Sequence, residues 1–252
     1  MSVVAIIPAR YGSSRLPGKP LALIGGKPMV QHVYESTAKA QGLDRVLVAT
    51  DDRRIERVVR SFGGEAVITS RRHRSGTDRL AEVARKLRAD WLVNVQGDLP
   101  FIAAATIAGA LEPVRRKRDL VMSTVCTAIY DINEWRSPNV VKVVRAPSGF
   151  ALYFSRAPIP FVREAAGSRQ AGGHSLAVLG YRHLGLYVYR RDFLLKLSRL
   201  PTGPLEQAES LEQLRVLENG YRIYVTEVEE RSIEVDTPAD LKQAGLYWRA
   251  NN

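Results

Sequence analysis

Cysteine is scarce in this sequence and long apolar runs are absent, and each absence excludes a class of protein. The single cysteine, Cys126, excludes an internal disulfide and a zinc site built from cysteines, and it is compatible with a reducing cytoplasm. The apolar runs stay well below the roughly 20 residues that span a bilayer. The first run is interrupted at Pro8 and Arg10, too early for a secretory signal. We therefore expect a soluble, cytoplasmic protein with no membrane partner.

Acidic residues are fewer than basic ones, which points to anionic partners. The 252-residue chain has 37 Lys and Arg against 26 Asp and Glu, a formal net charge of +11. Such a charge favours nucleic acid, a membrane surface, or a small phosphorylated or acidic substrate. The densest basic cluster covers residues 115–118, and the other basic residues are scattered in pairs, as on solvated helix faces. A nucleic-acid-binding module stays an alternative, but we expect no nucleic acid as the main partner.

Residues 6–20 combine cations with glycine, serine and proline directly after an apolar run that predicts a first buried strand. Main-chain N–H groups and cations in such a turn can bind a polyphosphate. The groups in question are the main chain of Gly12, Ser13 and Ser14 and the side chains of Arg10, Arg15 and Lys19. The spacing differs from that of a P-loop, so we predict another kind of nucleotide site. A charged surface loop is the competing interpretation.

Up to about residue 125 the pattern alternates between strands and helices. Buried strands are predicted at 46–50, 66–68, 91–95 and 121–125, and helices at 28–38, 53–62, 78–87 and 103–111. This alternation predicts an α/β fold with a mostly parallel sheet covered by helices on both faces. Ligands of such sheets lie at the carboxyl ends of the strands.

The pattern changes at about residue 131. Strand-like segments at 140–144, 150–154 and 184–189 are separated by turn residues, and residues 166–173 form a glycine-rich surface loop. We interpret this region as a smaller β-rich insertion that makes the sheet mixed and can supply a dimer interface. A helix is predicted at 205–217, with Glu212 and Gln213 on its surface, followed by a strand at 223–226. The whole chain, 1–252, is expected to form a single domain.

Two aspartates are candidate metal ligands. Asp98 follows the strand at 91–95, where an α/β enzyme holds a metal, although a helix cap would use the same residue type. Asp236 precedes a capping arrangement of Thr237 and Asp240 and has no structural role of its own in the pattern. Thr77 is a plausible N-cap for the helix at 78–87.

A second polar group lies in the later strands. His183 and Tyr187 are four residues apart, a spacing that projects both side chains to one face of a strand. Arg156 stands beside a proline-rich turn. An Arg, a His and a Tyr can bind a carboxylate and hydroxyls, but a strand-end arginine and a buried structural histidine are the commoner case.

Taken together, these segments resemble the 3-deoxy-manno-octulosonate cytidylyltransferases, also called CMP-Kdo synthetases. The shared motifs are IPARY at 7–11, RLPGKP at 15–20, SGT at 75–77, NVQGD at 94–98, PNVVKVV at 138–144, ALYFSR at 151–156, RHLG at 182–185, LEQLR at 211–215 and VDTP at 235–238. The first two are shared with other sugar-activating nucleotidyltransferases, and the later ones are more specific. The likeness extends from residue 4 to about residue 241.

The resemblance implies a Rossmann-like nucleotidyltransferase fold, usually in a homodimer. The implied reaction transfers CMP from CTP to the anomeric hydroxyl of Kdo, an acidic eight-carbon sugar, with release of pyrophosphate, for lipopolysaccharide biosynthesis in a Gram-negative cell. Residues up to about 130 would then form the nucleotide-binding half, and residues from about 131 the sugar-binding and dimerisation half. A non-catalytic CTP sensor is disfavoured because the sugar-site motifs are present.

The resemblance also implies roles for individual residues. It assigns two Mg²⁺ ions to Asp98 and Asp236, which form the catalytic set together with Arg10, Arg15 and Lys19. It assigns CTP to Pro8, Ala9, Gly12, Ser13, Ser14, Arg74, Ser75, Gly76 and Gln96. It assigns the sugar carboxylate to Arg156 and the sugar hydroxyls to His183, Tyr187, Glu212 and Gln213.

One residue departs from the family pattern. The family's loop usually reads Gln-Gly-Asp-Glu-Pro, and here Leu99 stands in place of the Glu. An outward-facing neutral replacement is the simpler interpretation, and a changed sugar preference is the other. Transfer of CMP to a related acidic sugar, such as 8-amino-Kdo or a sialic acid, therefore stays an alternative.

Overall fold

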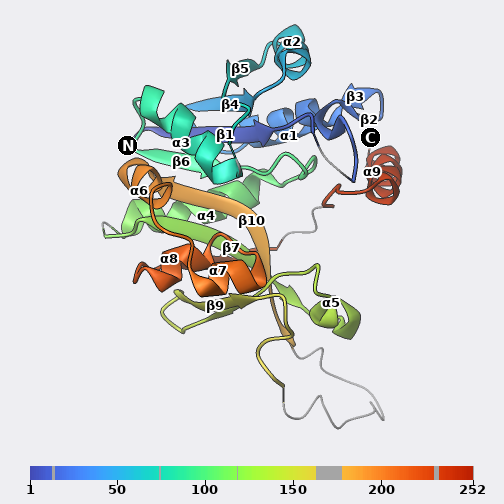
Figure 1. Ribbon diagram of the computed structural model, residues 1–252. Coiled ribbons are helices and arrows are strands. Elements are labelled where there is room, and N and C mark those ends of the chain that lie inside the picture. Colours follow the sequence, from blue (N-terminus) through green and yellow to red (C-terminus); the bar gives the residue numbers. More distant parts are fainter. Residues whose placement is uncertain (13–14, 74, 118, 163–177, 230–232, 252) are drawn as a thin grey trace.

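The computed structural model describes residues 1–12, 15–73, 75–117, 119–162, 178–229 and 233–251, which build one large mixed sheet with helices on both faces (Figure 1). The main path of the sheet runs β11-β7-β10-β6-β1-β4-β5. Its strands are β1 (Val3–Ala9), β4 (Arg45–Thr50), β5 (Glu65–Ile68), β6 (Trp91–Asn94), β7 (Met122–Ile129), β10 (Gly180–Arg190) and β11 (Tyr224–Glu227).

The first half of the chain forms the parallel part of this sheet. Strand β1 lies between β4 and β6 and is parallel to both, and β5 continues in parallel beside β4. Strand β10 is antiparallel to its neighbours β6 and β7, while β11 is parallel to β7. The predicted mostly parallel, mixed sheet is therefore confirmed. Strands β8 (Lys142–Arg145) and β9 (Ala151–Ser155) extend it beyond β10.

Helices cover both faces because their apolar sides match the buried strand residues. One face is covered by α1 (Met29–Ala38), α2 (Arg53–Ser61) and α4 (Ala104–Arg116). The other face is covered by α3 (Gly76–Lys86), α6 (Arg191–Leu197) and α8 (Leu214–Glu218). No helix within the described residues is long and apolar enough to cross a membrane.

A small third hydrophobic cluster lies at the start of α1. Helix α9 (Pro238–Asn251) packs on the hairpin of β2 (Leu23–Ile24) and β3 (Lys27–Pro28), with Met29, Val235 and Trp248 in the contact. The short 3-10 helix η1 (Lys19–Leu21) precedes this hairpin. Thr237 and Asp240 exchange the predicted capping bonds at the start of α9. This packing places the residues before α9 beside the segment that follows β1.

The single helix predicted at 205–217 is wrong. The segment forms α7 (Pro204–Glu209) and then α8, because Ser210 adopts a left-handed conformation at φ 52° and ends the first helix. Across the break, Arg215 binds the carboxylate of Glu206 at 2.6 Å. The surface placement of Gln213 is also wrong, because this side chain is buried. Apolar spacing alone does not reveal a one-residue break of this kind.

Three smaller expectations also change. Helix α3 begins two residues earlier than predicted, and its N-cap is Ser75, whose hydroxyl accepts from the N–H of Asp78, so Thr77 lies inside the helix. Leu99 is 2% exposed in the main core, so the outward-facing interpretation is wrong.

The glycine-rich segment 166–173 lies outside the described residues. A short helix, α5 (Ile132–Arg136), was not predicted.

Candidate active site

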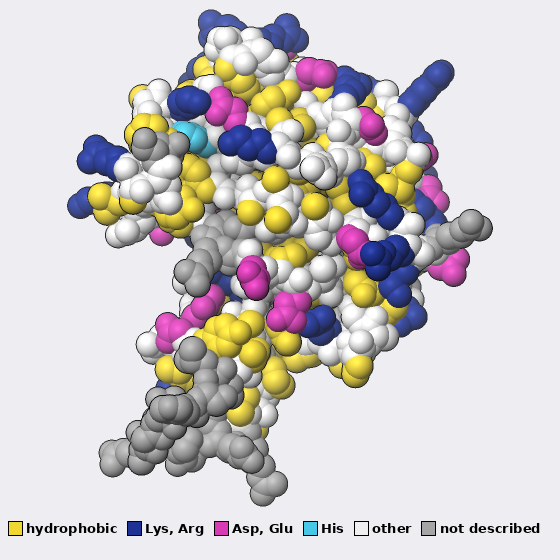
Figure 2. All heavy atoms as spheres, turned by 180° about the vertical axis from the view of Figure 1, so that it is seen from behind, with side chains coloured by type: hydrophobic (Ala, Val, Ile, Leu, Met, Phe, Trp, Pro, Cys, Tyr) yellow, Lys and Arg dark blue, Asp and Glu magenta, His cyan; other side chains and the backbone are white. Residues whose placement is uncertain are grey.

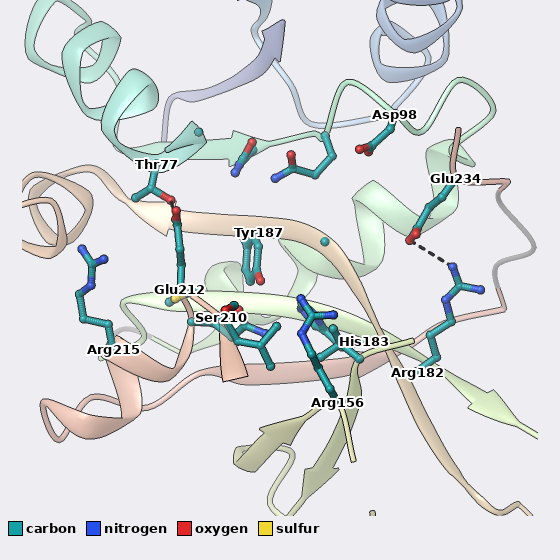
Figure 3. A pocket seen from close by; sticks show the side chains of 18 of the residues that line it. Thr77, Asp98, Arg156, Arg182, His183, Tyr187, Ser210, Glu212, Arg215 and Glu234 are labelled. Carbon is teal, nitrogen blue, oxygen red and sulfur yellow. Dashed lines mark hydrogen bonds and ion pairs between the residues drawn. The ribbon is translucent and has the colours of Figure 1, made fainter. Parts of the chain in front are cut away.

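A cavity of about 440 Å³ opens between the carboxyl end of β6 and the face of β10 (Figure 3). Polar side chains from segments far apart in the sequence line it. They include Thr77, Asn94, Gln96, Asp98, Asn139, Arg156, Arg182, His183, Tyr187, Ser210, Glu212, Gln213, Arg215 and Glu234. The cavity therefore joins the parallel half of the sheet to the later strands.

At one end of the cavity, a lysine joins two carboxylates. The Nζ atom of Lys19 lies 3.1 Å from Asp98 Oδ2 and 3.0 Å from Asp236 Oδ1. Arg15 binds the other oxygen of Asp236 at 3.0 Å. Burial by itself lowers the pKa of Lys19, but the two carboxylates outweigh it and raise that pKa above its ordinary value. This end is thus a compact cluster of alternating charges.

Main-chain contacts fix the two aspartates. Asp98 follows β6, and its carbonyl accepts a hydrogen bond of 2.9 Å from the N–H of Val235. Asp236 directly follows Val235, and the N–H of Asp236 donates a hydrogen bond to the Asp240 carboxylate at the start of α9. The helix cap and this bond together hold Asp236 opposite Asp98.

The predicted His183 and Tyr187 pair lies on one face of β10, with ring centroids 5.3 Å apart. A bulge between Leu184 and Tyr187 places two extra residues in β10, so the two side chains stay on the same face. Burial lowers the pKa of His183 to about 3, so its ring is neutral at pH 7. Burial raises the pKa of Tyr187, so its hydroxyl stays protonated.

The tautomer of His183 follows from its neighbour. The Thr124 hydroxyl lies 2.9 Å from His183 Nε2, and the same hydroxyl donates to the carbonyl of Leu186 at 2.7 Å. Because a hydroxyl has one hydrogen, Nε2 must carry the proton and donate to Thr124. The Nδ1 atom of His183 is then an acceptor.

Main-chain carbonyls hold Arg156. Its Nε donates to the carbonyl of Glu209 at 2.8 Å, and Nη1 donates to the carbonyl of Pro138 at 3.1 Å. The two bonds orient a guanidinium that lines the cavity beside His183 (Figure 3). A planar guanidinium fixed in this way suits a carboxylate.

The break between α7 and α8 supplies the opposite wall. Glu212 points toward Thr77 in Figure 3 and accepts a hydrogen bond of 2.6 Å from its hydroxyl. Gln213 is only 6% exposed. The start of α3 and the segment at 210–213 are therefore tied together across the cavity.

The remaining loops meet beside Pro8, and one of them requires a glycine there. A Cβ atom on Gly97 would lie 2.8 Å from the carbonyl oxygen of Pro8, so only glycine fits there. A Cβ on Gly76 would lie 3.8 Å from the Pro8 ring. The end of β1, the start of α3 and the loop after β6 therefore converge on one place.

Comparison with known proteins agrees with this geometry. A family model described as cytidylyltransferase matches residues 4–225. The 3-deoxy-manno-octulosonate cytidylyltransferase of Geotalea uraniireducens is 54% identical, with 96% of this chain and 97% of that protein covered. The enzyme of the same name from Syntrophotalea carbinolica is 54% identical, with 99% of each covered. This chain belongs to the 3-deoxy-manno-octulosonate cytidylyltransferase family.

A solved structure extends the likeness to three dimensions. A CMP:2-keto-3-deoxy-manno-octonic acid synthetase, solved as a complex with CTP, superposes with a TM-score of 0.92 at 45% identity, and each chain is covered completely. The chain is therefore a nucleotidyltransferase with the fold of the cytidylyltransferases.

The structure of this cytidylyltransferase places eight of the predicted site residues around one cavity. Gln96, Asp98, Arg156, His183, Tyr187, Glu212, Gln213 and Gly76 line it. Arg15 and Lys19 contact its aspartates, whereas Pro8, Ala9, Arg10 and Gly12 follow at the carboxyl end of β1. Ser75 caps α3 directly before Gly76. Ser13, Ser14 and Arg74 lie outside the described residues.

Several residues that line this cavity were not predicted. Arg182 binds Glu234 at 3.1 Å and Glu134 at 3.4 Å, and Figure 3 draws the first of these pairs as a dashed line. Asn139, Ser210 and Arg215 also line the cavity. The sequence held signals for them, because Asn139, Arg182 and Arg215 belong to the shared motifs at 138–144, 182–185 and 211–215, and Glu234 lies two residues before Asp236.

The carboxylates of the site fit a metal ion only in part. No group of three or more His, Cys, Asp and Glu side chains in the described part of the chain could hold one. Asp98 and Asp236, however, approach closely enough to share the Lys19 ammonium. Two carboxylates completed by substrate phosphate oxygens and water fit Mg²⁺, which rarely has an all-protein cage.

Proposed function

We propose that this protein transfers CMP from CTP to the anomeric hydroxyl of 3-deoxy-manno-octulosonate (Kdo) and releases pyrophosphate. The observation that carries the proposal is the cavity that runs from Asp98 to Arg156 (Figure 3). At the Asp98 end, the carboxylates and the neighbouring cations suit a triphosphate with bound metal ions. At the Arg156 end, an arginine beside neutral polar groups suits a sugar that carries a carboxylate and hydroxyls. The product, CMP-Kdo, would serve lipopolysaccharide biosynthesis.

The nucleotide would lie along the segment that follows β1. The proposed triphosphate contacts are Arg10, Arg15, Lys19 and the N–H of Gly12, and the proposed cytosine contacts are Pro8, Ala9, Ser75, Gly76 and Gln96. The convergence of three loops beside Pro8 supports this assignment. The roles of Ser13, Ser14 and Arg74 stay predictions.

The sugar would occupy the cavity between β10 and the segment at 210–213. Arg156 would pair with its carboxylate, and the neutral His183 would accept a hydrogen bond from a hydroxyl at Nδ1. Tyr187 would donate a hydrogen bond, since its hydroxyl stays protonated. Glu212 and Gln213 would bind further hydroxyls from the opposite wall.

The reaction forms one bond and breaks one. The anomeric oxygen attacks the α-phosphorus as the bond from that phosphorus to the bridging oxygen of the leaving pyrophosphate breaks, and the hydroxyl proton is released. Arg10, Arg15 and Lys19 would balance the charge that moves onto pyrophosphate. Arg156 and His183 would hold the attacking hydroxyl in line.

Asp98 and Asp236 would hold two Mg²⁺ ions. When bound, the metal ions polarise the α-phosphate, lower the pKa of the attacking hydroxyl and neutralise the leaving group. The negative charge that these carboxylates present to Lys19 supports the assignment.

The second half of the chain would also form a homodimer. Large apolar side chains there are well exposed, among them Leu152 at 64%, Phe161 at 75% and Val178 at 43%. Hydrophobic side chains are visible on the lower part of the molecule in Figure 2. We place the single domain in the cytoplasm, where CTP is available, with residues up to about 130 serving the nucleotide and the rest serving the sugar and the dimer.

A turnover assay tests the function. With CTP, Kdo and Mg²⁺ we expect pyrophosphate release, which EDTA abolishes and Asp98→Asn or Asp236→Asn lowers by about 10³-fold or more. Equal turnover of Asp236→Asn and the native protein would refute the metal assignment. Competition among Kdo, 8-amino-Kdo and a sialic acid at equal concentration decides the sugar, and preference for another sugar would refute Kdo as the substrate.

A further inference from the structure

Lys142 in β8 is a buried cation that has main-chain carbonyls, and no solvent, around its ammonium group. The residue is 0% exposed, and its Nζ donates to the carbonyls of Ser137 at 2.8 Å, Val140 at 2.6 Å and Arg156 at 2.5 Å. An ammonium group has three hydrogens, so each has one acceptor. Burial also lowers the pKa of Lys142, which reflects the cost of placing a cation there.

The three carbonyls belong to two segments that form one wall of the cavity. Ser137 and Val140 flank Asn139 in the turn before β8, and Arg156 follows β9. Arg156 returns a bond from Nη1 to the carbonyl of Pro138 in the same turn. Lys142 therefore binds both segments, and the segments bind each other.

Glu209, at the end of α7, completes the network. Its carboxylate accepts from the Ser155 hydroxyl and, at 2.9 Å, from the N–H of Arg156. Its carbonyl accepts from Arg156 Nε. The main chain of Arg156 is thus held on one side by Lys142 and on the other by Glu209. Two of the five guanidinium N–H groups of Arg156 donate to carbonyls, and these two bonds fix the direction of the other three N–H groups.

We propose that Lys142 is a positioning residue of the sugar site: it fixes the main chain of Arg156 and of the 137–140 turn, and so aims the Arg156 guanidinium at the carboxylate of the sugar. This inference rests on the proposed function, because it gives Arg156 an acidic sugar to bind. Lys142 itself does not touch substrate. Its effect passes through Arg156, so it should be specific to the sugar.

The first experiment compares Lys142→Met with the native protein in steady-state turnover. Methionine keeps an unbranched chain and removes the three bonds. We expect the KM for Kdo to rise about tenfold or more while the KM for CTP stays within about twofold. Lys86→Met is the matched control, since Lys86 is 67% exposed on α3 and should change neither constant. A parallel rise of both KM values in Lys142→Met would overturn the inference.

The second experiment is a double-mutant cycle with Arg156→Met. If Lys142 acts through Arg156, the double variant has the KM for Kdo of Arg156→Met alone. Independent, multiplying effects would overturn the positioning role. Glu209→Gln is the second variant, because it breaks the same network from the other side and should also raise the KM for Kdo alone, even where Lys142→Met fails to fold.

Failure of the inference and failure of the proposed function are distinguishable in these assays. If the native protein releases no pyrophosphate with Kdo, the proposed function fails and the inference falls with it. If the native protein turns over and the Lys142→Met and Glu209→Gln variants keep the native KM for Kdo, only the positioning role fails.

Discussion

Lys19 sets the charge of the predicted metal site, because its ammonium binds both Asp98 and Asp236. A divalent cation that enters without nucleotide must compete with this ammonium. In the proposed complex with CTP, the lysine would bind phosphate oxygens instead. We therefore expect Mg²⁺ to bind the nucleotide-free protein weakly, and Lys19→Met to tighten that binding roughly tenfold while turnover falls.

Calorimetric titration with Mg²⁺, without CTP, measures this effect. Lys27→Met is the control, because Lys27 pairs with Glu35 on the exposed face of α1. Unchanged or weaker Mg²⁺ binding in Lys19→Met would show that the lysine and the metal do not compete.

His183 gives a pH-dependent contribution to stability. Burial lowers its pKa from the ordinary value of 6.5 to about 3 in the folded protein. Between these values the unfolded chain binds more protons, so stability is full above about pH 6.5 and falls with pH toward the folded pKa. The loss from this residue reaches about 2 kcal/mol at pH 5.

A non-titrating variant isolates this contribution. Plots of the free energy of unfolding against pH should be flatter between pH 6.5 and 5 for His183→Gln than for the native protein. Urea titrations at pH 7.5 and 5 measure it, whatever the offset between the two proteins at pH 7.5. Equal slopes would mean that the pKa of His183 is the same in the folded and the unfolded protein.

At the scale of single residues, sequence reasoning found the groups next to distinctive motifs. Asp98 follows a predicted strand and Asp236 precedes a predicted cap, so local pattern located both. Arg182 and Glu234 escaped because their pairing joins β10 to the segment before α9, and no local pattern encodes such a contact. Lys142 belongs to the shared motif at 138–144, but the motif does not show that its side chain is buried.

At the scale of elements, turn geometry limited the prediction. The apolar spacing over 205–217 fits one helix, yet Ser210 at φ 52° breaks it, and the broken segment carries Glu212 and Gln213 to the cavity. Serine is an uncommon residue for a left-handed position, so the sequence carries no glycine signal there. The break is therefore decided by tertiary contacts such as the pair of Arg215 and Glu206.

The turn between β2 and β3 provides a paired test of how α9 is held. Gly25 has φ +56°, and a Cβ there would lie 2.3 Å from Trp248 of α9, whereas Gly26 has φ +84° and nothing within 4 Å. Gly26→Ala should lose about 1–2 kcal/mol of stability from backbone strain alone. Gly25→Ala should lose at least about 1 kcal/mol more, or about 2–4 °C in Tm, because it also displaces Trp248.

Thermal unfolding followed by circular dichroism compares the two variants. Because Asp236 stands just before α9, Gly25→Ala should also bind Mg²⁺ and CTP together less tightly than Gly26→Ala. Equal Tm values for the two variants would mean that α9 does not depend on this contact.

At the scale of the whole molecule, alternating strands and helices predicted the α/β class, but the order of the strands was not predictable. Strand β10 inserts between β6 and β7, which are its neighbours in space but lie far before it in the sequence. Such pairings are chosen by long-range packing rather than by local propensity. This pairing matters for the proposed sugar site, because β10 carries His183 and Tyr187 to the cavity.

The exposed apolar side chains of the second half make the assembly state testable. Leu152 and Phe161 are 64% and 75% exposed, and a dimer interface would remove such surfaces from water. We expect the native protein to sediment as a dimer and Leu152→Glu, Phe161→Glu or the double variant to shift toward the monomer, since a carboxylate buried at an interface loses its hydration. Leu246→Glu is the control, because Leu246 is 50% exposed on α9, away from this surface. If the native protein sediments as a monomer, the proposed dimer is refuted. If only Leu246→Glu dissociates the dimer, the interface lies elsewhere.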